Sequence, residues 1–116
     1  MSDYCREKVV RMKVTREQLG IDSIWDMEDK YKELFGNGDI GKFEIAPTEE
    51  EFIDYLIDYC YGEECGDWGR VRKLTEKESA KYIEIFKQIY PDVKADDLRY
   101  VDFCWYNCSE APDYFD

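Results

Sequence analysis

Alternation of apolar and polar residues predicts short strands in four parts of the chain. The β-branched run at residues 9–14 alternates loosely, and Glu44 lies between two apolar neighbours after the turn at residues 37–39. Residues 70–74 form a third short segment. Residues 98–106 alternate over a longer stretch, and they favour a strand over a helix beginning after an aspartate at position 96.

The strongest helix signal follows Pro47. Thr48 and Glu51 have the spacing of a capping box, in which two side chains satisfy the first free backbone N–H groups of a helix. The next apolar residues recur at the i, i+3, i+4, i+7 spacing of one helical face. They are Phe52, Tyr55, Leu56 and Tyr59. We therefore expect a helix from Thr48 to about Cys60.

One further helix is expected on each side of this segment. Ser23 can cap a helix whose apolar stripe runs from Ile24 to Phe35 and which ends at Gly36. Thr75 begins another capping box, and Pro91 ends the helix after it. A third box, at residues 15–18, allows at most one turn because a glycine follows it.

The order of these elements predicts the fold class α+β. We expect a single small domain over residues 1–116, with about three helices packed on a short three- to four-stranded sheet, mixed or antiparallel. Residues 107–116 are expected to form an extended acidic tail.

Composition and charge exclude several classes of function. The 116 residues carry a net charge of −12, which argues against a protein that grips bare nucleic-acid phosphates. The chain has no histidine, so triads and zinc sites built on histidine are excluded. Neither a membrane-spanning apolar run nor the apolar core of a signal peptide is present, so we expect a cytoplasmic protein with reduced cysteines.

Acidic residues concentrate at positions 49–67, which hold eight carboxylates and no basic residue. On the expected helix Glu50, Asp54 and Asp58 would share one face, where like charges cost a few tenths of a kcal/mol each. One interpretation is a solvated acidic surface without a binding role. The other is a surface that docks on a basic protein. The candidate partner-binding residues are Glu49, Glu50, Glu51, Asp54, Asp58, Glu63, Glu64 and Asp67, with Tyr61 and Trp68 as aromatic anchors.

In size, net charge and this acidic run, the chain resembles small acidic proteins of phages and mobile elements that inhibit host nucleic-acid enzymes as DNA mimics. Anti-restriction and anti-CRISPR proteins include many of them. The resemblance implies a stoichiometric inhibitor without catalysis or cofactor. Its partner would be a basic protein, such as a nucleic-acid-binding enzyme, with no direct contact to nucleic acid or membrane. Exposed aromatic residues allow a homodimer without requiring one.

Two alternatives remain open. Cys60 and Cys65 form one cysteine pair and Cys104 and Cys108 another, which suggests a small zinc-binding domain, although neither pair has the tight spacing that structural zinc sites most often use. The 28 acidic residues also allow an enzyme that uses paired carboxylates. That alternative requires a polar pocket in which carboxylates converge.

Overall fold

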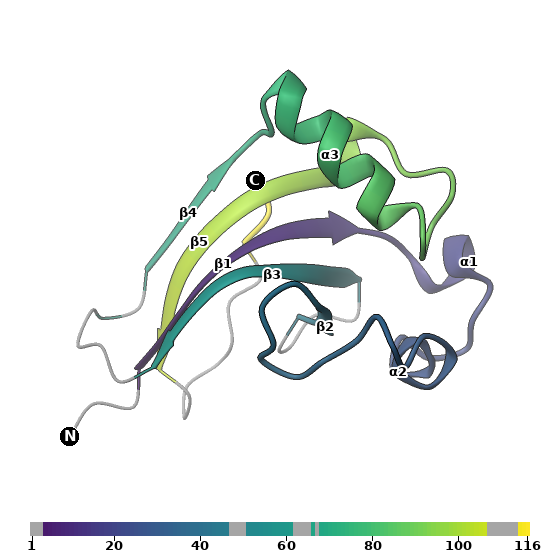
Figure 1. Cartoon of the computed structure of the whole chain (residues 1–116), viewed down its shortest axis with the longest axis horizontal. Coiled ribbons are helices and arrows are strands. Elements are labelled where there is room, and N and C mark those ends of the chain that lie inside the picture. Colours follow the sequence, from purple (N-terminus) through teal and green to yellow (C-terminus); the bar gives the residue numbers. More distant parts are fainter. Residues whose placement is uncertain (1–3, 47–50, 62–65, 67, 107–113) are drawn as a thin grey trace.

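The computed structural model describes residues 4–46, 51–61, 66, 68–106 and 114–116, which form a twisted antiparallel sheet with short helices around it (Figure 1). The five strands lie in the order β2-β3-β1-β5-β4. Their bounds are β1 Tyr4–Lys13, β2 Phe43–Ile45, β3 Phe52–Tyr61, β4 Trp68–Arg72 and β5 Leu98–Tyr106. The helices are α1 Arg16–Leu19, α2 Asp26–Lys30 and α3 Glu76–Phe86, with a 3₁₀ turn at Ala95–Asp97.

The sheet is built around β1, which pairs along its length with β3 on one side and β5 on the other. β2 and β4 are the edge strands, and they add three and five residues to β3 and β5. Because every neighbouring pair is antiparallel, side chains directly opposite each other project from the same face.

The expected three- to four-stranded sheet is wrong, because the segment expected to be the clearest helix forms β3. This strand is buried on both faces at its first half, so its apolar residues run almost without interruption. Such a run satisfies the helical spacing by coincidence. Its isoleucines, phenylalanine and tyrosines also suit a pleated strand.

α3 covers one face of the sheet, which we call the helix face (Figure 1). The expected capping box is confirmed, since the Thr75 hydroxyl accepts from the Glu78 N–H and the Glu78 side chain accepts from the Thr75 N–H. Tyr82 and Phe86 of α3 pack into the main core. The other buried members of this core are Val10, Met12, Val14, Ile24, Met27, Phe43, Ile45, Ile53, Ile89, Val93 and Leu98.

The chain's last residues cover part of the opposite face, which we call the tail face. Phe115 stacks on Phe52 with ring centroids 5.5 Å apart. Tyr114 packs against a small cluster of Val9, Leu56, Val101 and Phe103. Most of the expected tail lies outside the described residues, and its end belongs to the core.

The helix expected between Ser23 and Gly36 is much shorter than the sequence suggests. α2 spans five residues, and turns follow it up to Phe35, whose backbone bridges to Phe43 of β2. No helix in the described part of the chain is both long and apolar enough to span a bilayer.

Candidate functional site

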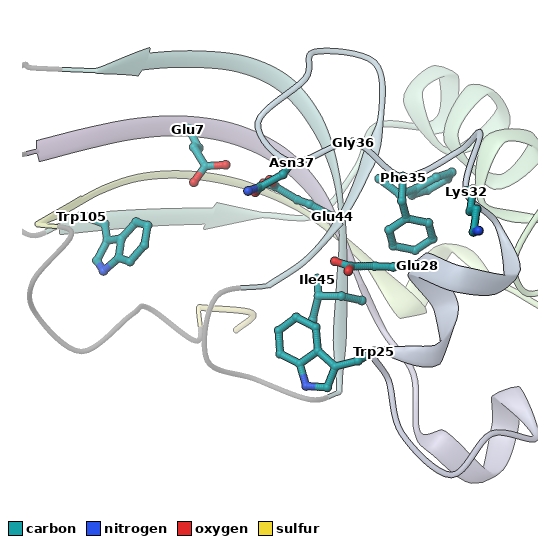
Figure 2. A pocket seen from close by; sticks show the side chains of 11 residues that line it. Glu7, Trp25, Glu28, Lys32, Phe35, Gly36, Asn37, Glu44, Ile45 and Trp105 are labelled. Carbon is teal, nitrogen blue, oxygen red and sulfur yellow. The ribbon is translucent and has the colours of Figure 1, made fainter.

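A cleft of about 490 Å³ lies where the β2 edge of the sheet meets α2 and the turns after it (Figure 2). The tail face supplies Glu7, Glu44 and Trp105, and the α2 region supplies Trp25, Glu28 and Lys32. In the view of Figure 2, Glu7 and Trp105 lie toward one end of the cleft and Trp25 and Glu28 toward the other. Phe35, Gly36, Asn37, Phe43 and Ile45 complete the lining.

Two carboxyl groups in this cleft share a hydrogen bond. Glu7 is 5% exposed, and it lies across β3 from Glu44, whose side chain is hydrogen-bonded to it. Burial, followed by the bond to Glu7, raises the pKa of Glu44 to about 10. Burial also raises the pKa of Glu7. Glu44 therefore holds a proton at neutral pH and donates it to Glu7.

The nearest guanidinium is already committed to another carboxylate. Arg11 donates to both oxygens of Asp54, at 2.8 and 2.9 Å, and both side chains are fully buried. Its remaining nitrogen, Nη1, donates to the Tyr114 carbonyl at 2.7 Å. Arg11 lowers the pKa of Glu7 less than burial raises it. The Glu7–Glu44 pair is thus left without a dedicated cation among the described residues.

Aromatic side chains form much of the remaining cleft surface. Trp25 is 51% exposed, the indole Nε1 of Trp105 is buried, and Phe35 packs against Phe43 with ring centroids 5.9 Å apart. Neither Trp105 Nε1 nor Glu44 Oε1 has a hydrogen-bond partner among the described residues. Buried polar atoms are usually paired, and both of these atoms are closed off from solvent.

The interpretation of Asp54 as a partner-binding residue is wrong, because its carboxylate is buried and neutralised by Arg11. Asp54 and Asp58 do not share a face as expected, and Glu50 lies outside the described residues. β3 has a bulge, where Val9 lies opposite Leu56 and Lys8 opposite Asp58, so Ile57 has no partner across the strand. As a result Asp58 projects from the helix face and Asp54 from the tail face.

The remaining candidates that the structure describes do not meet in one patch. Glu51 is exposed just before β3 begins, whereas Asp58 is exposed near its far end, on the face opposite to Tyr61, which is 57% exposed. Trp68 lies between two arginines of the same protein, with Arg6 and Arg70 each 5.2 Å from its ring centroid. Glu49, Glu50, Glu63, Glu64 and Asp67 lie outside the described residues.

The cysteines differ from the expected set of reduced thiols. Cys104 is disulfide-bonded, so it is not a zinc-ligating thiolate in this structure, and the other cysteines of the proposed site, Cys65 and Cys108, lie outside the described residues. Cys5 and Cys60 are thiols, one buried and one exposed. No group of three potential metal ligands occurs among the residues that the structure describes.

Sequence reasoning missed the residues of the cleft. Glu7 and Glu44 are single acidic residues within strands that are otherwise rich in apolar residues. Nothing in the sequence around either residue indicates that the two side chains meet. Alternation could have shown that Glu44 projects from the face opposite Phe43 and Ile45. Pairing it with Glu7 requires the strand order, which the sequence does not show.

Comparison of the chain with protein-family models, curated proteins and solved structures finds no match.

Proposed function

We propose that this protein is an acidic interaction module that binds a basic surface of a partner protein. The partner class is a nucleic-acid-binding enzyme, which the module would inhibit stoichiometrically by occupying its basic groove. The docking surface in this proposal is the cleft and the segment beside it, in place of the acidic run at positions 49–67.

The observation that carries the proposal is an exposed tryptophan among exposed carboxylates at the cleft. Trp25 is half exposed, and tryptophan is the residue type most enriched at interface hot spots. Residues 22–39 carry six exposed carboxylates against two exposed lysines, Lys30 and Lys32. We call these carboxylates the acidic rim; they are Asp22, Asp26, Glu28, Asp29, Glu33 and Asp39.

An acidic rim around an aromatic anchor suits a basic partner for two physical reasons. The negative field attracts a cationic surface and raises the association rate, and this effect falls as salt increases. The tryptophan then supplies apolar burial after contact, which salt affects little. Both features occur on the same short segment, so one contact patch would use both.

The experiment compares charge reversals of equal size at two places. The rim variant carries Glu28→Lys, Asp29→Lys and Glu33→Lys, none of which makes a side-chain hydrogen bond or ion pair in the described structure. The control variant carries Glu84→Lys, Asp92→Lys and Asp96→Lys, which are exposed positions on α3 and the loop after it. Affinity for nucleic-acid-binding proteins captured on the wild-type protein is then measured for both variants, with nuclease present and at two salt concentrations.

The proposal predicts that the rim variant loses binding at low salt and that the control variant keeps most of it. Trp25→Ala should lower affinity by about 2 kcal/mol or more and lower the melting temperature only slightly, because half of the side chain is exposed. Equal losses in both charge variants would mean that net charge alone drives binding. Binding that disappears with nuclease would mean that nucleic acid bridges the two proteins.

The site of action in this proposal is the cytoplasm, where host nucleic-acid enzymes are found. The disulfide of Cys104 weighs against that compartment, because persistent disulfides are rare there. Mass spectrometry of the protein purified from cells under thiol-blocking conditions decides whether the bond forms in them.

The Glu7–Glu44 pair also favours a second candidate function, an enzyme that uses paired carboxylates. A carboxyl and a carboxylate that share a proton can act as general acid and general base. Their direct contact is closer than the 5–10 Å or so that glycosidases keep between their two carboxyl groups. Peptide hydrolysis is therefore the reaction to assay first, and activity that survives both Glu7→Gln and Glu44→Gln would reject this candidate.

A further inference from the structure

We infer that the outer edge of β4 adds an extended segment of another protein as a sixth, antiparallel strand, and that this segment alternates acidic and apolar residues. β4 lies at the opposite end of the strand order from β2 and the cleft. This edge is therefore a second surface of the molecule, separate from the docking surface of the proposed function.

β4 is the edge of the sheet that is open in the described part of the chain. All five of its residues pair with β5, and no other described strand pairs with it. In Figure 1 it forms the outer margin of the sheet. The other edge is closed, because the Phe43 N–H of β2 donates to the Leu34 carbonyl at 2.8 Å and the Phe43 carbonyl accepts from the Gly36 N–H at 3.0 Å. An open edge carries a row of backbone groups that can pair with another chain.

The pairing of the sheet shows which backbone groups of β4 point outward. Along an antiparallel strand, successive residues bond alternately to the neighbour on one side and to the neighbour on the other. The Val14 N–H, just after β1, donates to the Glu51 carbonyl just before β3, at 2.9 Å. In this half of β1, every second residue back from Val14 therefore bonds to β3 and the others bond to β5. Continued through β5, this alternation directs Arg70 toward β5 and leaves the N–H and carbonyl groups of Gly69 and Val71 pointing outward.

The open edge carries positive charge that the described residues do not neutralise. Arg70 is exposed, and its guanidinium lies 5.2 Å from the Trp68 ring centroid without an ion pair in the described structure. Lys73, directly after β4, is also exposed and has no ion pair with a described residue. Arg72, in contrast, donates to both Glu78 oxygens, at 2.7 and 2.9 Å. In a chain with 28 acidic and 16 basic residues, two such cations beside an open edge favour an acidic occupant.

The two faces of the edge differ in polarity, and this difference predicts the alternation of the added strand. Arg70 projects from the helix face, since it is in register with Asp58 through β5 and β1. On the tail face, Val71 packs with the cluster that includes Tyr114, whose ring lies over Gly69. Residues opposite each other in neighbouring antiparallel strands project from the same face. The added strand would thus place acidic residues beside Arg70 and apolar residues beside Val71 and the Tyr114 ring.

Two other occupants fit this edge less well. Antiparallel pairing of β4 with β4 of a second copy would bring the arginines of both copies onto one face, where like charges repel. Nucleic acid would approach a molecule whose net charge is −12, which repels phosphates. An acidic peptide supplies both the negative charge that the second copy lacks here and the row of backbone donors and acceptors that nucleic acid lacks.

The probe for the test is a short, fluorescently labelled peptide of alternating valine and glutamate with blocked ends. Fluorescence anisotropy measures its affinity, and hydrogen exchange of the Gly69, Arg70 and Val71 amides in NMR spectra measures backbone pairing. Two modified probes are the matched controls, one with N-methyl groups on its valines and one with N-methyl groups on its glutamates. The valines would lie opposite Gly69 and Val71, so their amides would bond to β4, whereas the glutamate amides would point to solvent.

We expect the saturating probe to slow exchange of the Gly69 and Val71 amides by at least about tenfold. The Arg70 amide, which already faces β5, should not change. The probe methylated on its valines should not bind, because the methyl groups remove the donors that β4 would receive. The probe methylated on its glutamates should bind about as well as the unmodified one.

The charge of the edge is tested with Arg70→Glu, and the control is Lys87→Glu. Lys87 is an exposed residue just after α3, and it makes a surface ion pair with Glu84 at 3.2 Å. We expect Arg70→Glu to lower affinity for the probe at least about tenfold and Lys87→Glu to change it less than about twofold. The comparison of methylated probes uses the wild-type protein, so it tests the inference even if a variant does not fold.

Several outcomes would overturn the inference. They are binding of the probe methylated on its valines, unchanged exchange at Gly69 and Val71, and equal losses of affinity in the two charge variants. Slow exchange of the same two amides in the protein alone, lost on dilution, would identify a second copy as the occupant instead. Tighter binding of single-stranded DNA than of the peptide, lost in Arg70→Glu, would identify nucleic acid instead.

Discussion

Arg11 on β1 and Asp54 on β3 form a bidentate ion pair, and both side chains are inaccessible to solvent. The same guanidinium holds the Tyr114 carbonyl and lies between the rings of Phe52 and Phe103. One side chain therefore joins the centre of the sheet to the end of the chain.

Removing one member of this pair should be more damaging than removing both. Arg11→Met leaves a buried, unpaired carboxylate, so we expect the free energy of unfolding to fall by about 3–5 kcal/mol. The double variant with Asp54→Leu should recover much of that loss, because no charge remains buried. Urea denaturation of the wild type and the variants measures this. A double variant no more stable than Arg11→Met would show that the hydrogen bond to Tyr114 and the ring contacts matter more than the charge.

The Glu7–Glu44 pair should make the protein less stable as pH rises. The folded pKa of Glu44, about 10, lies above its ordinary value of 4.5, so its contribution is complete below pH 4.5 and is lost as pH rises toward 10. Glutamine cannot ionise, so Glu44→Gln should gain on the order of 1 kcal/mol over the wild type between about pH 5 and pH 9. Thermal unfolding across this range tests the sign. A stability difference that does not change with pH would mean that the pair is not protonated.

Gly69 of β4 lies directly under the Tyr114 ring. A Cβ atom at this position would overlap the ring carbons of Tyr114, so alanine cannot be accommodated unless the end of the chain moves. We expect Gly69→Ala to lower the free energy of unfolding by about 1–3 kcal/mol. Phe115→Ala is the companion variant, and a Gly69→Ala change with no effect in the Phe115→Ala background would place the whole cost in the displaced tail.

Glu78 should stabilise the protein only above moderately acidic pH. Hydrogen bonds from Arg72, and next from the Thr75 backbone, lower its pKa to about 2. Its contribution is therefore present above its ordinary pKa of 4.5 and is lost as pH falls toward 2. The melting temperatures of wild type and Glu78→Gln should converge as the pH falls from about 5 to 2. Parallel curves would contradict the role of this carboxylate.

The elements that the sequence predicts well are those whose signals are local. Thr75 and Glu78 are three residues apart, and their capping box forms as expected. The strands at 43–45 and 98–106 are recovered from their alternation, and part of β1 is recovered from its β-branched run, although its residues 9–12 are buried on both faces. β3 failed because strand order, which is not local, placed it in the interior with both faces covered.

The cleft depends on contacts that no local pattern contains. Glu7 and Glu44 are separated by 37 positions in the chain, and their contact crosses the strand between them. In contrast, the acidic run is obvious in the sequence, yet of its three described carboxylates Asp54 is buried, and Glu51 and Asp58 lie toward opposite ends of β3. For these three residues, charge density along the chain did not predict charge density on the folded surface.

The bulge in β3 has a consequence for the tolerance of this strand to deletions. Ile57 is the residue without a partner across β1, so its removal would leave Asp58 opposite Lys8 and Tyr59 opposite Glu7, as they are now. Keeping all ten residues in a regular ladder would instead bring Asp58 opposite Glu7, adding a third carboxyl group beside the pair. Ile57 therefore has no partner in the ladder although it packs against the main core, and the bulge keeps Asp58 away from the Glu7–Glu44 pair.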